Sequence, residues 1–86
     1  MRLDQFLKES RIIKRRTSAK QMCDEGFVFV NSKKAKASYE VKIGDEIEIY
    51  FKQKKVKYKV EDLPQKGTPK SLAKNYYTTI SEEYYE

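Results

Sequence analysis

Residues 10–17, Ser-Arg-Ile-Ile-Lys-Arg-Arg-Thr, join two short segments that each have the apolar spacing of an amphipathic helix. In the first segment, Leu3, Phe6 and Leu7 recur at positions i, i+3 and i+4, which predicts a helix over residues 3–9. The joining stretch places two branched apolar side chains among four cations. We therefore expect an elbow that buries one isoleucine and exposes its charges to solvent.

The second segment carries its own start and stop signals. Ser18 and Gln21 have the spacing of a capping box, with Thr17 as the alternative N-cap. Gly26 follows where a left-handed residue commonly ends a helix. Helices of about eight residues are not stable alone in water, so packing must hold both of them. The face expected to pack consists of Ala19, Met22 and Cys23.

Beyond this helix, the apolar period changes to that of β-strands. Residues 27–30 are a β-prone run, residues 31–33 have the composition of a turn, and apolar side chains alternate with polar ones over residues 35–41. This region therefore predicts a strand, a turn and a second strand.

Strict alternation over residues 46–51, a turn at 53–54 and alternation over 56–60 predict an antiparallel hairpin. The lysines of its second strand have the composition that protects an exposed sheet edge. All these elements together predict an α+β fold, with two short helices packed on a small antiparallel sheet. The positions that the period places in the core include Phe27, Phe29, Ile47, Ile49 and Phe51.

The end of the chain follows neither period. Prolines and a glycine interrupt a polar stretch after residue 62, residues 72–80 have the spacing of a fraying helix, and residues 81–86 are acidic and rich in tyrosine. We therefore divide the chain into one domain, residues 1–62, and a C-terminal tail, residues 63–86, that is partly helical or disordered.

Composition argues against catalysis. The 86 residues include no histidine and a single cysteine, which removes the commonest general base, the commonest metal ligand and any intramolecular disulfide. We expect no catalytic residue, no metal site and no cofactor. The longest apolar run, residues 27–30, is far shorter than the ~20 residues that span a bilayer, which predicts a cytoplasmic protein without a membrane segment.

Positive charge is concentrated towards the N-terminus. The chain has 19 basic and 13 acidic residues, for a net charge of +6, and all four arginines lie within the first sixteen residues. A planar guanidinium can bind phosphate through two parallel hydrogen bonds, so this clustering favours RNA over a merely solvated helix face. The start of the second helix is a candidate anion site, since its free N–H groups lie beside Arg15, Arg16 and Lys20.

Several spaced motifs resemble those of the S4 RNA-binding domain. The resemblance implies a fold in which two helices and the following strand form an L-shaped RNA-binding surface, with no chemistry of its own. A free-standing S4 chain of this length is similar to small factors of bacterial ribosome-associated quality control. The matching motifs include the start Met-Arg-Leu-Asp-Gln-Phe-Leu at 1–7 and residues 10–17, 19–20, 26, 30–31, 36–38 and 41–45.

The resemblance also implies the partners. Proteins of this kind bind a large (50S) ribosomal subunit that still carries a nascent chain on its tRNA, and they contact 23S rRNA and the P-site peptidyl-tRNA there. They support an alanine-tailing factor of the NEMF type, which extends the stalled chain with C-terminal alanine. Such a protein is expected to be a monomer away from the ribosome and to bind no membrane.

The family's RNA-contacting positions map onto this sequence residue by residue. Arg2 and Arg16 match the arginines ahead of the two helices, and Ser10 and Arg11 match the Ser-Arg pair of the elbow. The sequence departs from the family at one turn, where the usual Asn-Gly is Asn-Ser. The RNA-binding residues predicted from resemblance and charge together are Arg2, Ser10, Arg11, Lys14, Arg15, Arg16, Thr17, Lys20, Asn31 and Lys36.

Three alternatives stay open on the sequence alone. Asp4 either orients a neighbouring arginine or interacts favourably with the dipole of its helix. A different function is that of an RNA-binding accessory subunit of an RNA-modifying enzyme, since S4 domains commonly precede pseudouridine synthases. Attraction to anionic lipid is a third explanation of the positive charge, although the helices lack a large exposed apolar face.

Overall fold

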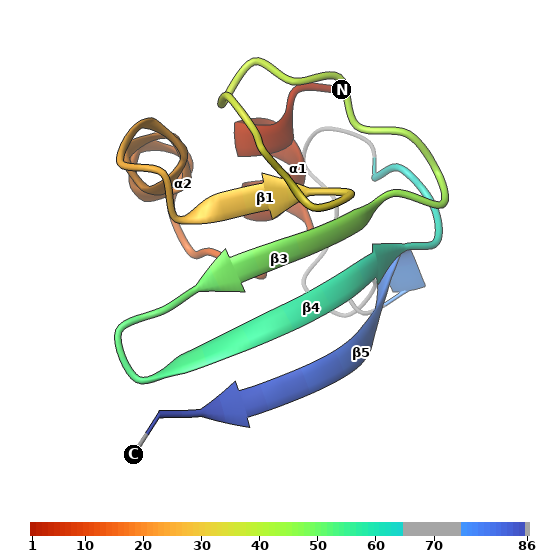
Figure 1. Ribbon diagram of the computed structural model, residues 1–86. Helices are drawn as coiled ribbons and strands as arrows, with labels where there is room; N and C mark the ends of the chain where they lie inside the picture. Colours follow the sequence, from red (N-terminus) through yellow and green to blue (C-terminus); the bar gives the residue numbers. More distant parts are fainter. Residues whose placement is uncertain (65–74, 86) are drawn as a thin grey trace.

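The computed structural model describes residues 1–64 and 75–85, which form two helices and one antiparallel sheet of five strands (Figure 1). The strands are ordered β2-β1-β3-β4-β5, with the helices at the β1 end and β5 at the opposite edge. The predicted α+β fold is therefore confirmed. The elements are α1 (Leu3–Glu9), α2 (Arg16–Asp24), β1 (Val28–Val30), β2 (Lys33–Lys34), β3 (Glu46–Tyr50), β4 (Lys54–Val60) and β5 (Tyr77–Tyr84). Within the described ranges, no helix is long and apolar enough to cross a membrane.

The core lies between α1 and one face of the sheet. Leu3, Phe6 and Leu7 are fully buried, as their helical spacing predicts. They belong to one cluster with the inward-facing residues of the strands, because alternate side chains of a strand point to the same face. The strand residues of this cluster are Val28, Val30, Ile47, Ile49 and Val60.

The elbow between the helices buries Ile13, which is 7% exposed, as one of its two isoleucines was expected to be. Ser10 ends α1, and Arg11 then adopts a positive φ of 66° that turns the chain away from the helix axis. The elbow therefore reverses direction through a backbone conformation that L-residues rarely adopt.

The predicted capping box of α2 is wrong. The helix begins at Arg16, two residues before Ser18, and its N-cap residue Arg15 makes no side-chain cap hydrogen bond. Arg16, the first residue of α2, contacts Asp4 of α1. This tertiary contact explains why the helix begins before the predicted capping residue Ser18. The predicted end is confirmed: Gly26 has a φ of 85°, and its N–H donates to the Cys23 carbonyl at 3.0 Å in a Schellman arrangement.

Cys23 is buried on the inner face of α2, as its spacing predicts. Burial is the main reason why the pKa of its thiol rises to about 11. The thiolate is the reactive form of cysteine, so this side chain acts as a small apolar core residue.

The turn between β1 and β2 has two central residues with positive φ, Asn31 at 51° and Ser32 at 71°. This is the geometry of a type I′ hairpin turn, whose favoured sequence is Asn-Gly. The serine is therefore strained where glycine would not be.

Replacing that serine by glycine is expected to stabilise the protein. We predict that Ser32→Gly raises the free energy of unfolding by about 0.5–1 kcal/mol, because relief of strain exceeds the added freedom of the unfolded chain. Urea denaturation measures the change. Ser38→Gly is the matched control, since Ser38 is exposed but has no positive φ, and it should give no gain. A lower denaturation midpoint for Ser32→Gly would contradict the strain argument.

The segment 35–41 differs from its predicted strand. Its apolar residues Ala35, Ala37 and Val41 are buried, as the alternation predicts. The backbone, however, is irregular, and a single bridge pairs Glu40 with Arg2. Residues 35–41 show alternating burial because hydrogen bonds hold this segment against residues 1–4, and not because it forms a strand of the sheet.

Two aromatic residues predicted for the core, Phe27 and Phe29, lie outside it, whereas Phe51 packs against the edge of the core cluster. Phe27 is 44% exposed, and Phe29 and Phe51 are only half-buried. The cause is the pleat: Val28 faces the core, so its neighbour Phe29 must point to the other face of the sheet. The predictions for Ile47 and Ile49, both fully buried, are confirmed.

The predicted helical or disordered tail is wrong for residues 77–84, which form strand β5 along the whole of β4. Glu82 pairs with Lys54 at 2.9 Å, and Glu83 lies 3.4 Å from Lys55. The lysines of β4 therefore face acidic residues of a neighbouring strand and do not protect a sheet edge. Residues 72–74 of the predicted tail helix lie outside the described residues, and the division at residue 62 stays a prediction.

Candidate nucleic-acid interface

The carboxylate of Asp4 lies at the centre of the basic surface. Its Oδ1 accepts hydrogen bonds from Arg2 Nε at 3.2 Å and from the Gln5 backbone N–H at 2.8 Å. Its Oδ2 accepts from Arg2 Nη2 at 3.4 Å and lies 3.4 Å from Arg16 Nε. The Asp4 side chain is 3% exposed, whereas those of Arg2 and Arg16 are 44% and 46% exposed. We call these three residues the Arg–Asp–Arg cluster.

Both explanations of Asp4 fit the structure: the carboxylate contacts two arginines from different parts of the chain, and it also lies in the first turn of α1, where a negative charge suits the helix dipole. Arg2 precedes α1, and Arg16 lies in the first turn of α2. Two guanidinium groups share one carboxylate, so the cluster keeps a formal net charge of +1. The arginines are therefore held in place without being neutralised.

The backbone around Arg2 is fixed. The Leu3 N–H donates to the Tyr39 carbonyl at 2.8 Å, and the Val41 N–H donates to the Met1 carbonyl at 2.9 Å. The terminal amine also lies 2.9 Å from a carboxylate oxygen of Glu40. Arg2 is therefore a positioned residue rather than part of a loose terminus.

Further cations surround a hollow between α2 and the segment after the β1–β2 turn. Arg2, Lys20, Lys34 and Lys36 all contribute to its lining. Lys20 Nζ also donates to Asp24 Oδ2 at 2.7 Å, and this hydrogen bond to the carboxylate is the main reason why the pKa of Lys20 is raised. Lys34 was not among the residues predicted to bind RNA. The two-residue turn brings it opposite Phe29, so the register of this hairpin was the signal in the sequence that could have identified it.

The elbow presents a second group of cations. Arg11, Lys14 and Arg15 are exposed there, and Thr17 is exposed in the first turn of α2. No side-chain hydrogen bond caps this end of α2 within the described chain. Unpaired N–H groups beside cations favour an anion such as phosphate.

Ser10 requires a correction as an RNA contact. Its side chain is fully buried, and its hydroxyl donates to the Leu7 carbonyl at 3.4 Å. A residue that ends α1 inside the elbow cannot touch RNA in this conformation. The sequence pattern located the elbow correctly but did not show which of its polar residues faces inward.

The side chain of Asn31 has a structural role, because it links two turns by hydrogen bonds. Its amide nitrogen donates to Asp45 Oδ1 at 3.1 Å, and its amide oxygen accepts the Glu46 N–H at 3.0 Å. Both ends of the amide are therefore engaged within the protein. These bonds join the β1–β2 turn to the turn before β3, and so position the neighbouring lysines.

Asp45 is the buried centre of this second network. Besides Asn31, it accepts hydrogen bonds from the Tyr39 hydroxyl and the Lys42 N–H, both at 2.9 Å. Burial pushes the pKa of Asp45 up, but the hydrogen bonds from Lys42, Asn31 and Tyr39 outweigh it, so the pKa lies below its usual range. A charged carboxylate thus holds the loops beside the basic surface.

The arrangement suits binding of phosphates rather than catalysis. Among the described residues there is no cluster of histidine, cysteine, aspartate and glutamate that could hold a metal ion. Two helices, an elbow and a hairpin present exposed cations around a fixed pair of guanidinium groups. These features define a nucleic-acid-binding module, and the S4 domain family matches residues 1–47. The chain belongs to this family.

Comparison with curated proteins narrows the family further. The chain is 51% identical over 83 residues to the RQC P-site tRNA stabilizing factor of Bacillus subtilis (strain 168), covering 96% of this chain and 95% of that protein. It is 36% identical to the protein of the same name from Helicobacter pylori (strain 26695), covering 96% of this chain and all of that protein. These relatives place the chain among the RQC P-site tRNA stabilizing factors, which confirms the prediction of a non-enzymatic RNA-binding factor.

Solved structures agree with this fold. The trimeric structure of Vibrio cholerae heat shock protein 15 superposes with a TM-score of 0.85 at 27% identity, covering 94% of this chain and 82% of that chain. The solution structure of the hypothetical protein HP1423 gives a TM-score of 0.81 at 35% identity, covering 94% of this chain and 98% of that chain.

Proposed function

We propose that this protein binds RNA on an obstructed large ribosomal subunit and stabilises the P-site tRNA there. The observation that carries the proposal is the 51% identity, over nearly the whole chain, to the Bacillus subtilis RQC P-site tRNA stabilizing factor. The Arg–Asp–Arg cluster supports it, because two oriented and exposed guanidinium groups form a phosphate-binding surface. The function needs no covalent chemistry.

The proposed RNA-binding surface has three parts. The Arg–Asp–Arg cluster lies in the middle, the elbow cations lie at the junction of the helices, and the lysines of the β1–β2 hairpin complete it. Base-independent phosphate contacts of this kind fix the position of a protein on folded RNA. The contacting residues in this proposal are Arg2, Arg11, Lys14, Arg15, Arg16, Thr17, Lys20, Lys34 and Lys36.

A small rigid protein can stabilise a tRNA by contacting two RNA molecules at once. In this proposal the two are 23S rRNA and the peptidyl-tRNA in the P site of the 50S subunit. Holding that tRNA in place allows an alanine-tailing factor of the NEMF type to extend the stalled chain with C-terminal alanine. We place this activity in the cytoplasm, where translating ribosomes are found.

Sedimentation tests the proposal directly. Lysate containing the tagged protein is separated on a sucrose gradient at low salt, and the fractions are probed for the protein and for peptidyl-tRNA. We expect the protein in the fractions that hold 50S particles with peptidyl-tRNA. A protein that stays at the top of the gradient even at low salt would refute the proposal.

A further inference from the structure

A hollow of about 600 Å³ lies beside the turn between β1 and β2, next to the hollow that Arg2 and Lys20 line. The two hollows share a border, because residues 34–36 and 38 contribute to the lining of each. We call the one beside the turn the hairpin hollow. The basic surface therefore continues past the hairpin. The polar lining of the hairpin hollow consists of Asn31, Lys33, Lys34, Lys36, Ser38 and Tyr39.

The lysines of the hairpin hollow have no carboxylate partner among the described residues. Neither Lys33, Lys34 nor Lys36 forms an ion pair there, whereas three lysines of β4 each contact a glutamate of a neighbouring strand. Asp45 accepts hydrogen bonds from two lining residues of the hollow, but it is only 7% exposed. The hollow therefore presents positive charge to an incoming anion.

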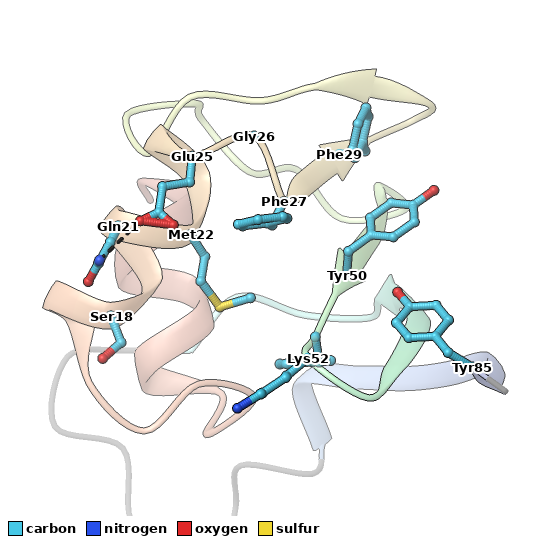
Figure 2. Close-up of a pocket in the computed structure, with 11 residues that line it drawn as sticks. Ser18, Gln21, Met22, Glu25, Gly26, Phe27, Phe29, Tyr50, Lys52 and Tyr85 are labelled. Carbon is cyan, nitrogen blue, oxygen red and sulfur yellow. Dashed lines mark hydrogen bonds between the residues drawn. The ribbon is translucent and has the colours of Figure 1, made fainter.

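A larger groove, on the other side of α2, has a different character (Figure 2). Met22 and Phe27 contribute apolar surface to it, and Lys52 is the one cation among its lining residues. Gln21 and Glu25 also line it, and they are hydrogen-bonded to each other at 3.1 Å. Positive charge that can meet a phosphate therefore collects at the hairpin hollow and not in this groove.

Tyr39 holds a fourth lysine beside the hairpin hollow. The Tyr39 hydroxyl and the Lys42 backbone N–H donate to the same oxygen of Asp45, Oδ2, both at 2.9 Å. The ammonium nitrogen of Lys42 lies 5.5 Å from the centre of the Tyr39 ring, which is within the range of a cation–π interaction. Lys42 is nevertheless exposed. It is therefore a positioned cation, although it was not among the residues predicted to bind RNA.

The backbone ties the hairpin hollow to the Arg–Asp–Arg cluster. The Tyr39 carbonyl accepts the Leu3 N–H at 2.8 Å, and the Ala37 carbonyl accepts the Asp4 N–H at 3.1 Å. Leu3 and Asp4 follow directly after Arg2 in the sequence. The two groups of cations therefore keep a fixed spacing, which suits a ligand whose negative charges are also regularly spaced.

We propose that the hairpin hollow binds a second stretch of RNA backbone, beside the stretch held by the Arg–Asp–Arg cluster, with Lys33 and Lys42 as phosphate contacts. The inference rests on the proposed RNA-binding function and adds these two residues to its surface. A nucleic-acid duplex carries one negative charge per roughly 1.7 Å of its axis, so RNA that lies across the first hollow also supplies phosphates to the adjoining one. An extended acidic peptide carries at most one charge per roughly 3.3 Å, so it matches two adjoining groups of cations less well.

The salt dependence of RNA binding tests the inference, because each phosphate contact adds about one to the slope of log affinity against log salt. The probe is a short RNA hairpin, titrated with protein by fluorescence anisotropy between about 50 and 200 mM salt. Lys33→Gln and Lys42→Gln should each lower the slope by about one, and the double variant by about two. Over this range, the affinity of the wild type should therefore fall about tenfold more than that of the double variant.

Lys52→Gln/Lys54→Gln is the matched control. It removes the same charge around the β3–β4 turn, where neither lysine lines either of the two hollows. We expect the control to keep the wild-type slope. Lys33 and Lys42 are both exposed, so their double variant should fold, and thermal melts verify this.

Equal slopes for Lys33→Gln/Lys42→Gln and the control would overturn the inference while the proposed function stands. The inference would also be overturned if the wild type bound a poly-glutamate peptide as tightly as RNA and the double variant did not, because the hollow would then belong to an acidic protein. If the wild type binds no RNA, the proposed function fails, and the inference fails with it.

Discussion

Asp4→Asn is expected to weaken RNA binding about tenfold, although it raises the net charge from +6 to +7. Simple attraction to phosphate would predict tighter binding. In the structure, however, both oxygens of Asp4 hold guanidinium groups, and an asparagine would turn its NH₂ group towards one of these donors. Arg2 and Arg16 would then lose their fixed positions, and charge-assisted hydrogen bonds of this kind contribute about 1.5–3 kcal/mol.

A matched substitution separates positioning from charge. Asp24→Asn removes the same charge from the same basic surface, but Asp24 only forms an exposed ion pair with Lys20. We expect this control to bind RNA as tightly as the wild type or more tightly, because exposed pairs contribute little to structure. Titration of a ribosomal RNA hairpin with each protein measures the difference. Asp4→Asn binding as tightly as Asp24→Asn would show that the carboxylate does not position the arginines.

Asp45→Ala is expected to lower the free energy of unfolding by about 3 kcal/mol, the largest stability effect we predict. The substitution removes the common acceptor of the Lys42 N–H, the Tyr39 hydroxyl and the Asn31 amide. These donors would be left without their partner in a site that is 7% exposed at Asp45. Chemical denaturation measures the loss, with Asp24→Ala as the exposed control. A loss no larger than that of the control would contradict the assigned network.

The same carboxylate predicts a pH dependence. The folded pKa of Asp45 is lowered, so its contribution to stability is complete above the unfolded pKa of about 3.9 and is lost as pH falls through the folded value. The asparagine of the Asp45→Asn variant cannot titrate. The difference in the free energy of unfolding between the wild type and this variant should therefore shrink as the pH is lowered below about 4. Denaturation curves of the two proteins over that range provide the measurement. If the difference in the free energy of unfolding does not change with pH, ionisation of Asp45 does not stabilise the fold.

Local patterns predicted the N-terminal part of the fold well. Leu3, Phe6 and Leu7 define α1 through their spacing alone, and Gly26 marks the end of α2 because only a left-handed residue fits there. The resemblance to S4 domains added the identity of the elbow and of Arg2 and Arg16. These features depend on neighbours within a few residues, which a sequence displays directly.

Contacts between distant residues were not predictable in the same way. Strand β5 is acidic and polar, and its pairing becomes evident only beside the lysines of β4, from which a long segment separates it. The outward position of Phe29 depends on which face of β1 the helices cover, and periodicity alone cannot supply this. The role of Asp4 likewise requires the first turn of α2 to lie next to the start of α1.

In the proposed function, the Arg–Asp–Arg cluster binds ribosomal RNA directly. The most direct test is the affinity of Arg16→Ala for purified 50S subunits carrying peptidyl-tRNA, compared with Lys59→Ala, which removes one positive charge from an exposed position on β4. We predict a loss of about 1–3 kcal/mol for Arg16→Ala and almost none for Lys59→Ala, with both proteins folded. Equal affinities for the two variants would contradict the account.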